Sequence, residues 1–435
     1  MTSISPLKFF TALTAIGLAT CSPPNLAASK ADQTTWLHCG NVIDTAEGET
    51  LEQRFIRIDN NTIGEVTTER PANTSIVDLS DKTCLPGLMD MHVHLDGEMN
   101  PKSYIDGFTL NPADLAYRAQ DFGKKTLMAG FTTVRNPGDS YNVTISLRNA
   151  INQGLVDGPR IYSAGKSLAT TGGHADPTNG TNAQLMGDPG PKEGVVNSVE
   201  GARKAVRQRY KEGADFIKIT ATGGVLSLAK SGQNPQFTEE ELRSVIETAN
   251  DYGMHVAAHA HGDEGMLRAV NAGITTIEHG TYMSENVMQA MKKKGTYYVP
   301  TIIAGKFVAE KAEIDGFFPE IVRPKARAVG PQIQNTFAKA YDYGVKIAFG
   351  TDSGVSAHGD NGKEFQYMVE AGMPAMEAIQ SATVTSAELL ENNNIGVIAE
   401  SKLADIIAVD GDPIEDITLL QNISFVMKDG KIYKQ

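Results

Sequence analysis

The sequence is poor in cysteine and in positive charge. Its three cysteines cannot build a disulfide scaffold for a chain of 435 residues. Lys and Arg number 39 against 52 Asp and Glu, which gives a net charge of −13, and no long basic run occurs. Nucleic acid is therefore not an expected partner, because its binding needs a positive surface. The same deficit argues against electrostatic attachment to an anionic membrane.

Long apolar runs and phosphate-binding glycine motifs are also missing. After the N-terminal leader, no segment is apolar enough to span a bilayer. No motif of the G-x-G-x-x-G or G-x-x-x-x-G-K type follows a strand-like run, which argues against a nucleotide-binding fold. Hydrophobic residues make up 41% of the chain and charged residues 21%. This composition is that of a globular protein and excludes disorder for most of the chain.

Residues 1–28 have the order of a secretory signal peptide. A single positive charge, at Lys8, precedes the uncharged and mostly apolar stretch Phe9–Thr20, and a small, polar segment follows. The apolar stretch is too short to span a membrane. We therefore expect an exported protein that is periplasmic or secreted.

Two endings of this leader compete. Cleavage near Ala28 would release the mature chain. Alternatively, Leu18–Cys21 resembles a bacterial lipobox, in which a lipid on Cys21 would anchor the protein to a membrane. Thr20 departs from the Gly, Ala or Ser that usually precedes such a cysteine, so both endings stay open.

The rest of the chain has strand-like flanks around a middle in which helices and strands alternate. Turn residues separate short strand-like runs in both flanks: Trp36–Ile43, Arg54–Asp59, Thr62–Thr67, Ser75–Leu79, Ala404–Val409, Ile423–Lys428 and Lys431–Tyr433. In the middle, Ser284 can cap a helix over Glu285–Lys294, Gly295 stops it, and a strand over Tyr297–Ile303 follows. Repetition of such units favours a (β/α)8 barrel or a doubly wound sheet.

Side chains that can bind metal fall at the ends of successive predicted strands. They are His92, His94, Lys218, His259, His279 and Asp352. His92 and His94 are two residues apart, so in a strand both imidazoles point to the same side. Each residue alone also fits a structural role, such as a buried polar group with a partner or a lysine whose ammonium reaches solvent. Their repetition over five strand–helix units indicates a shared metal site.

In this order, these residues resemble the amidohydrolase superfamily. The matching segments are Pro86–His94, Lys218, His259, Ile277–Gly280, Gly350–Ser353 and Leu403–Val409. The resemblance covers nearly the whole chain after the leader. It implies an α/β protein with a (β/α)8 TIM barrel over residues 86–394. A small β-sandwich would be built from the flanks, residues 34–85 and 395–435.

The resemblance also implies a site for two divalent metal ions. His92, His94 and Asp352 would bind the more buried ion, and His259 and His279 would bind the second. We expect Zn²⁺, although a donor set of imidazole and carboxylate does not by itself fix the metal. The ions would lower the pKa of a bridging water, so that hydroxide exists near neutral pH.

Two of these residues would have further roles. Lys218 would be carboxylated by CO₂ to a carbamate that bridges the two ions, which converts a costly buried cation into an oxygen ligand. Asp352 would take the proton of the attacking water and deliver it to the leaving amine. Asp352 is therefore the predicted catalytic residue.

Within the superfamily, the sequence looks most like the group of metal-dependent Xaa-Pro dipeptidases and imidazolonepropionases. The resembling segments are Thr132–Arg135, Gly158–Ile161 and Thr171–His174. The group implies an amidohydrolase that releases a C-terminal amino acid from dipeptides or N-acyl amino acids, with ochratoxin A-like amides included. Two alternatives stay open: a cyclic amide hydrolase of the imidazolonepropionase type, and an inactive binding protein on the same scaffold.

Three more residues are candidates for substrate binding. His174 and His261 could line the pocket, and the guanidinium of Arg135 could bind a substrate carboxylate. A structural role is as plausible for each, and for Arg135 it would be a salt bridge. Cys39 and Cys84 could form a disulfide or remain free thiols, because spatial distance decides. We also expect a homo-oligomer.

Overall fold

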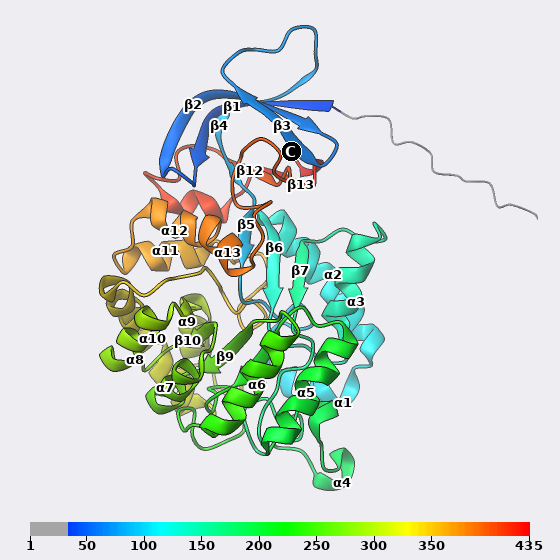
Figure 1. Cartoon of the computed structure of the whole chain (residues 1–435), viewed down its shortest axis with the longest axis vertical. Helices are drawn as coiled ribbons and strands as arrows, with labels where there is room; N and C mark the ends of the chain where they lie inside the picture. The colour runs from blue at the N-terminus through cyan, green and yellow to red at the C-terminus, as the bar shows by residue number, and fades with distance from the viewer. Residues whose placement is uncertain (1–33) are drawn as a thin grey trace, which may run out of the picture.

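The computed structural model describes residues 34–435, and Figure 1 shows how their helices and strands are arranged. The predicted signal peptide, residues 1–28, and the lipobox Cys21 lie outside the described residues. Within residues 34–435, no helix combines the length and the apolarity that crossing a bilayer requires.

Strands from both flanks of the chain form one seven-stranded sheet at one end of the molecule (Figure 1). In spatial order the strands are β14 (Lys431–Lys434), β13 (Phe425–Lys428), β12 (Ile406–Val409), β4 (Ile76–Pro86), β1 (Thr34–Asp44), β2 (Glu49–Asp59) and β3 (Thr62–Thr67). The two flanks meet where β4 pairs in parallel with β1 and antiparallel with β12. Since β4 is hydrogen-bonded on both edges, the flanks share one continuous sheet, which differs from the two-sheet sandwich that we expected.

The strands of this sheet share an apolar core, which is separate from the core around the parallel strands. Its buried members include Leu37, Ile56, Ile58, Ile406, Ala408, Phe425 and Met427. Cys39 in β1 and Cys84 in β4 belong to the same core and form a disulfide with their Cα atoms 6.0 Å apart. Of the two alternatives for these cysteines, the structure therefore contains the disulfide.

The middle of the chain contains two parallel sheets. The three-stranded sheet has the order β5 (Leu88–Asp90), β6 (Phe131–Asn136) and β7 (Arg160–Ser163). The four-stranded sheet has the order β11 (Tyr297–Val299), β10 (Thr276–His279), β9 (Val256–Ala260) and β8 (Ile217–Thr220). All neighbours in these sheets pair in parallel, which requires the intervening helices as crossovers.

Isolated parallel bridges continue the pairing beyond the two sheets. Leu168, after β7, pairs with Ile219 of β8, and Tyr298 of β11 pairs with Ile347. A third bridge joins Val93 to Ser353. Across residues 34–435 the parallel strands thus form two separate sheets with isolated bridges at their edges, and this pairing does not by itself show the closed (β/α)8 barrel that we expected.

Helices connect and cover the parallel strands (Figure 1). They are α1 (Ser103–Thr109), α2 (Pro112–Met128), α3 (Val143–Asn152), α4 (Ala183–Met186), α5 (Val199–Glu212), α6 (Glu239–Asp251), α7 (Asp263–Ala272), α8 (Glu285–Lys294), α9 (Ile302–Lys311), α10 (Arg323–Tyr343), α11 (Lys363–Glu370), α12 (Ala375–Ser381) and α13 (Val384–Leu389). Short 3₁₀ helices occur at Pro191–Glu193 and Ile417–Gln421.

Local signals explain where helix α8 begins and ends. The Ser284 hydroxyl accepts a hydrogen bond from the Val287 amide at the N-terminus, and Gly295 ends the helix with a φ of 73°. These are the bounds that the sequence predicts. The strand expected over Tyr297–Ile303 instead ends at Val299, because helix α9 begins at Ile302.

Arg160 on β7 joins the parallel strands to the C-terminal part of the flank sheet. Its guanidinium contacts Asp405 Oδ2 at 2.7 Å and Asp429 Oδ1 at 2.5 Å. The Asp405 side chain is only 4% exposed, so its carboxylate depends on this partner. Removal of one partner from such a buried pair leaves an uncompensated charge.

We expect Arg160→Met to lower the free energy of unfolding by about 3 kcal/mol, because Asp405 would stay buried without its cation. Urea denaturation followed by circular dichroism measures the change. The matched control is Arg268→Met, which removes a surface ion pair with Glu264 and should cost less than about 1 kcal/mol. Equal losses in both variants would contradict this role for Arg160.

Candidate metal centre

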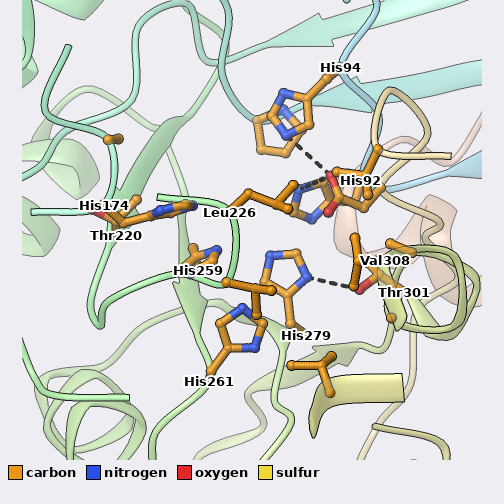
Figure 2. Close-up of a pocket in the computed structure, with 18 of the residues that line it drawn as sticks. His92, His94, His174, Thr220, Leu226, His259, His261, His279, Thr301 and Val308 are labelled. Atoms are coloured by element: carbon orange, nitrogen blue, oxygen red, sulfur yellow. Dashed lines mark hydrogen bonds and ion pairs between the residues drawn. The ribbon is translucent and has the colours of Figure 1, made fainter. Parts of the chain in front are cut away.

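The six predicted ligands line one cavity of about 220 Å³. They are His92 and His94 after β5, Lys218 on β8, His259 on β9, His279 on β10, and Asp352 in the segment between α10 and α11. Figure 2 shows the imidazoles of these histidines gathered around one space, with His174 and His261 beside them. The structure therefore brings together every residue that the sequence predicts as a metal ligand.

Protein acceptors fix the orientation of the first two histidines. His92 donates from Nδ1 to Glu278 Oε2 at 2.7 Å, and His94 donates from Nδ1 to the Gly138 carbonyl at 2.9 Å. With Nδ1 engaged in each ring, Nε2 carries the free lone pair and points into the cavity. Such bonds from the outer nitrogen are usual for histidines that bind metal.

The other two histidines are held in two different ways. His279 Nδ1 lies 2.8 Å from Thr301 Oγ1, which again leaves Nε2 for the cavity. In His259, by contrast, Nε2 lies 3.2 Å from the Gly223 carbonyl, so Nδ1 is the free nitrogen. The four imidazoles therefore offer three Nε2 atoms and one Nδ1 atom.

Asp352 completes a set of donors with metal-like spacing. Its Oδ1 lies 3.5 Å from His92 Nε2 and 3.4 Å from His94 Nε2. Tetrahedral ligands of a Zn²⁺ ion, each about 2.1 Å from the metal, are about 3.4 Å apart. Donor atoms of His92, His279 and Asp352 also lie within 4.8 Å of one another. This donor set fits a divalent cation.

Burial keeps these histidines neutral, as a metal ligand must be. Loss of solvation lowers the pKa of His94 to about 4, with Lys218 adding to the effect. The pKa values of His92, His259 and His279 lie well below the usual value for the same main reason.

Burial also changes the protonation of the other two predicted ligands. It lowers the pKa of Lys218 to about 8, so the neutral amine that reacts with CO₂ is accessible near physiological pH. Burial raises the pKa of Asp352 to about 7, and the charge of Lys218 opposes this rise. A bound cation would favour the Asp352 carboxylate further.

Three residues of the site have backbone angles that are rare outside glycine. The φ angles are 69° at His279, 56° at Asp352 and 53° at Thr301. Each lies in the left-handed region, where side chains with a Cβ are disfavoured. Such strain gathers at functional sites, since the surrounding structure must hold it.

His174 and His261, which we expected to line the pocket, both line this cavity, and their contact with a substrate stays a prediction. The His174 ring stacks on His259 with 4.2 Å between centroids, and within residues 34–435 its buried Nδ1 has no hydrogen-bond partner. His261 Nδ1 lies 2.8 Å from Thr281 Oγ1. At Gly224 a Cβ atom would come within 2.2 Å of the His174 ring, so only glycine allows this placement.

Arg135 is not in the cavity, which corrects its prediction as a residue that binds a substrate carboxylate. Its side chain is completely buried. The guanidinium donates to Glu278 Oε1 at 2.6 Å and to the Met91 carbonyl at 2.7 Å. The alternative, a structural salt bridge, describes what the structure shows.

Two buried carboxylates that the sequence analysis did not assign organise the ligands. Glu278 accepts from both His92 and Arg135. Asp90 accepts from the His92 amide at 3.0 Å and the Thr351 amide at 3.1 Å, so it fixes two ligand-bearing segments together. Both residues stand inside the segments that carry the family resemblance, where they could have been identified.

A second cavity of about 790 Å³ adjoins the first. The two share His94 and Val355 in their linings. Residues from α1, from α4 and from the intervening loops surround the larger space, including Tyr141, Lys166 and Met186. The candidate metal centre therefore has beside it a cavity whose volume is in the range of small-molecule sites.

The sequence pattern of the Amidohydrolase family matches residues 83–433. The chain belongs to this family. Together with the helices and parallel strands, this membership establishes a mixed α/β protein whose neighbours are of the TIM-barrel type.

Within this family, the chain is similar to proteins named for the hydrolysis of amide or peptide bonds. Over 436 aligned residues the chain is 31% identical to ochratoxinase from Aspergillus niger, covering 95% of this chain and 89% of that protein. A crystal structure of a Xaa-Pro dipeptidase with methionine bound in the active site is 55% identical, with a TM-score of 0.90, and covers 93% of this chain and 100% of its own. A prolidase complexed with N-methylphosphonate-L-proline is 33% identical, with a TM-score of 0.85 and the same coverage. These relatives establish the chain as a hydrolase of amide bonds.

We expect Glu278→Gln to weaken metal binding about 10- to 100-fold, because the amide cannot hold both His92 and Arg135 as the carboxylate does. Metal titration of the folded, metal-depleted protein measures this. The matched control is Asp405→Asn, another buried carboxylate paired with an arginine but outside the cavity. It should lose stability and keep its metal affinity. Unchanged affinity in Glu278→Gln would contradict the role of this carboxylate.

Proposed function

We propose that the protein is a binuclear metal-dependent amidohydrolase that releases a C-terminal amino acid from dipeptides or N-acyl amino acids, ochratoxin A-like amides included. The observation that carries this proposal is the convergence of four neutral imidazoles, Lys218 and Asp352 on one buried cavity. The methionine and the proline phosphonate in the two solved relatives support an amino acid as one product.

The donor set accommodates two divalent cations, for which we propose zinc. One would be held by His92, His94 and Asp352, and the other by His259 and His279. Lys218, as a carbamate formed with CO₂, would supply oxygen ligands to both. When bound, such ions polarise a carbonyl group and lower the pKa of water.

Residues of the chain would transfer the proton, bind the substrate and exclude water. Asp352, whose Oδ1 faces the cavity between two imidazoles, would accept the proton of the attacking water and donate it to the leaving amine. His174 and His261 would hold polar groups of the substrate, because both face the cavity beside the ligands. The buried walls would exclude bulk water from the reaction.

We also propose that the two parallel sheets form a closed (β/α)8 barrel over residues 86–394, with the flanks, 34–85 and 395–435, as a second domain. Three isolated bridges support closure: Leu168–Ile219 pairs the segment after β7 with β8, and Tyr298–Ile347 and Val93–Ser353 pair β11 and the segment after β5 with the stretch 347–353. Exposed apolar side chains on α1 and α2, such as Ile105, Phe108 and Tyr117, support assembly into a homo-oligomer.

Export of the protein is a further part of the proposal. The Cys39–Cys84 disulfide supports it, because disulfides persist in oxidising compartments such as the periplasm. A lipid anchor at Cys21 remains a prediction from the sequence. Both agree with a hydrolase that acts outside the cytosol.

Replacement of Lys218 tests the metal bridge. We expect Lys218→Ala to lose metal and to reduce activity by about a thousandfold or more, because the oxygen ligands between the ions are gone. Acetate or formate should restore part of the activity by supplying these oxygens. Lys339→Ala, which changes an exposed lysine, should behave as wild type. Normal activity in Lys218→Ala would overturn the mechanism.

A substrate panel tests the reaction itself. The metal-loaded protein is offered dipeptides, N-acyl amino acids, ochratoxin A and imidazolonepropionate, and amino acid release is followed by chromatography. We expect turnover of linear amides with a free C-terminal carboxylate. Turnover of the cyclic amide alone would favour the imidazolonepropionase type, and turnover of nothing would favour a binding protein.

A further inference from the structure

We propose that the apolar half of the catalytic cavity is a subsite for an apolar side chain of the released amino acid, and that Lys325 positions the roof of this subsite. The proposal rests on the proposed function and names its substrate class. The wall consists of Val225, Leu226, Ala304, Val308, Val329 and Ile333. Figure 2 shows Leu226 and Val308 beside the histidine cluster.

The chemistry of the cavity lining indicates what this half can bind. Among the residues that line it, the ionisable side chains are the predicted ligands together with His174 and His261. The apolar wall therefore offers no partner to a charged side chain, which would lose its hydration without compensation. An aliphatic side chain would instead gain from burial there.

Two helices supply four of the six residues of this wall, and a loop supplies the other two. Val329 and Ile333 are four residues apart on α10, and Ala304 and Val308 are four residues apart on α9. Residues with this spacing lie on one face of a helix, so each helix presents a pair of apolar side chains to the cavity. α9 and α10 pack closely, since at Gly305 a Cβ atom would lie 2.6 Å from Ile333.

The roof is the loop 222–229 after β8, which carries Val225 and Leu226 into the cavity. Lys325 lies four residues before Val329, on the same side of α10. Its Nζ donates to three carbonyls of the loop, at 3.1 Å to Gly224, 2.8 Å to Ser227 and 2.8 Å to Ala229. An ammonium has three N–H donors, so each finds one acceptor.

The loop needs these donors, because it is partly buried and has no regular secondary structure to pair its carbonyls. The hydroxyl of Tyr104 on α1 holds it from another element, donating to the Leu226 carbonyl at 2.9 Å. Lys325 thus connects the wall on α10 to the roof and sets the distance between them. Lys325 does not line the cavity itself, and it affects the substrate only by holding this loop in place, so it is a positioning residue.

The experiment compares side chains on otherwise equal substrates. Glycyl and N-acetyl derivatives of leucine, glycine and aspartate are offered to the metal-loaded wild-type protein, and kcat/KM is measured for each. Binding of free leucine and glycine is measured by calorimetry. We expect kcat/KM for leucine to exceed that for glycine about ten- to a hundredfold, and aspartate to be no better than glycine.

Variants distinguish a positioning role of Lys325 from a general effect on the stability of the protein. We expect Lys325→Met to lower the leucine-to-glycine ratio of kcat/KM at least fivefold, mainly through KM, with metal content unchanged. Lys325→Arg, which keeps the charge and several donors, should retain most of the ratio. Leu226→Ala should also lower the ratio, because it removes part of the roof. Lys339→Met, an exposed lysine on the same helix, should keep it.

The outcomes distinguish this proposal from the proposed function. A wild-type ratio of one or less, a preference for aspartate, or an unchanged ratio in Lys325→Met would overturn the subsite or the role of Lys325, although hydrolysis occurs. Binding of leucine over glycine without hydrolysis of any amide would support the subsite and contradict the proposed function. Equal loss of the ratio in Lys339→Met would overturn the role of Lys325.

Discussion

The buried carboxylate of Glu278 is the contact on which the candidate site most depends. One oxygen accepts from His92, and the other accepts from Arg135, whose guanidinium also holds the Met91 carbonyl beside β5. Because all of these groups are removed from water, each needs its partner, and the partners fix one geometry. The result is an imidazole whose free nitrogen faces the cavity. A surface ion pair could not supply this rigidity.

The same principle, full satisfaction of buried polar groups, extends outward from the ligands. Asp90 ties the His92 segment to the segment before Asp352, and Lys325 ties the roof loop to α10. Polar networks hold the histidine end, whereas packing between α9 and α10 forms the apolar end. The site thus combines a candidate metal-binding half with the apolar half that we propose as a subsite for a substrate side chain.

Short sequence patterns predicted several features of the fold and of the candidate site. The spacing of His92 and His94 predicted that both imidazoles face one side, and both line the cavity, although strand β5 ends at Asp90 before them. Ser284 and Gly295 delimited α8. Contacts between distant residues were not predictable, because no local signal marks them. Arg135 meets Glu278 across 143 residues, so its role as a structural salt bridge stayed one of two alternatives. Lys325 meets its carbonyls across 96 to 101 residues and was not identified at all. The flanks likewise proved to be one sheet, because β4 pairs on both edges.

The number of metal ions bound per chain decides whether the centre is binuclear. The protein is purified with bicarbonate and without chelators, and divalent metals per chain are counted by mass spectrometry with inductively coupled plasma. We expect close to two ions per chain, with zinc the main metal. Less than one ion per chain, in protein that is folded and has not been exposed to chelator, would contradict a binuclear centre at His92, His94, Lys218, His259, His279 and Asp352.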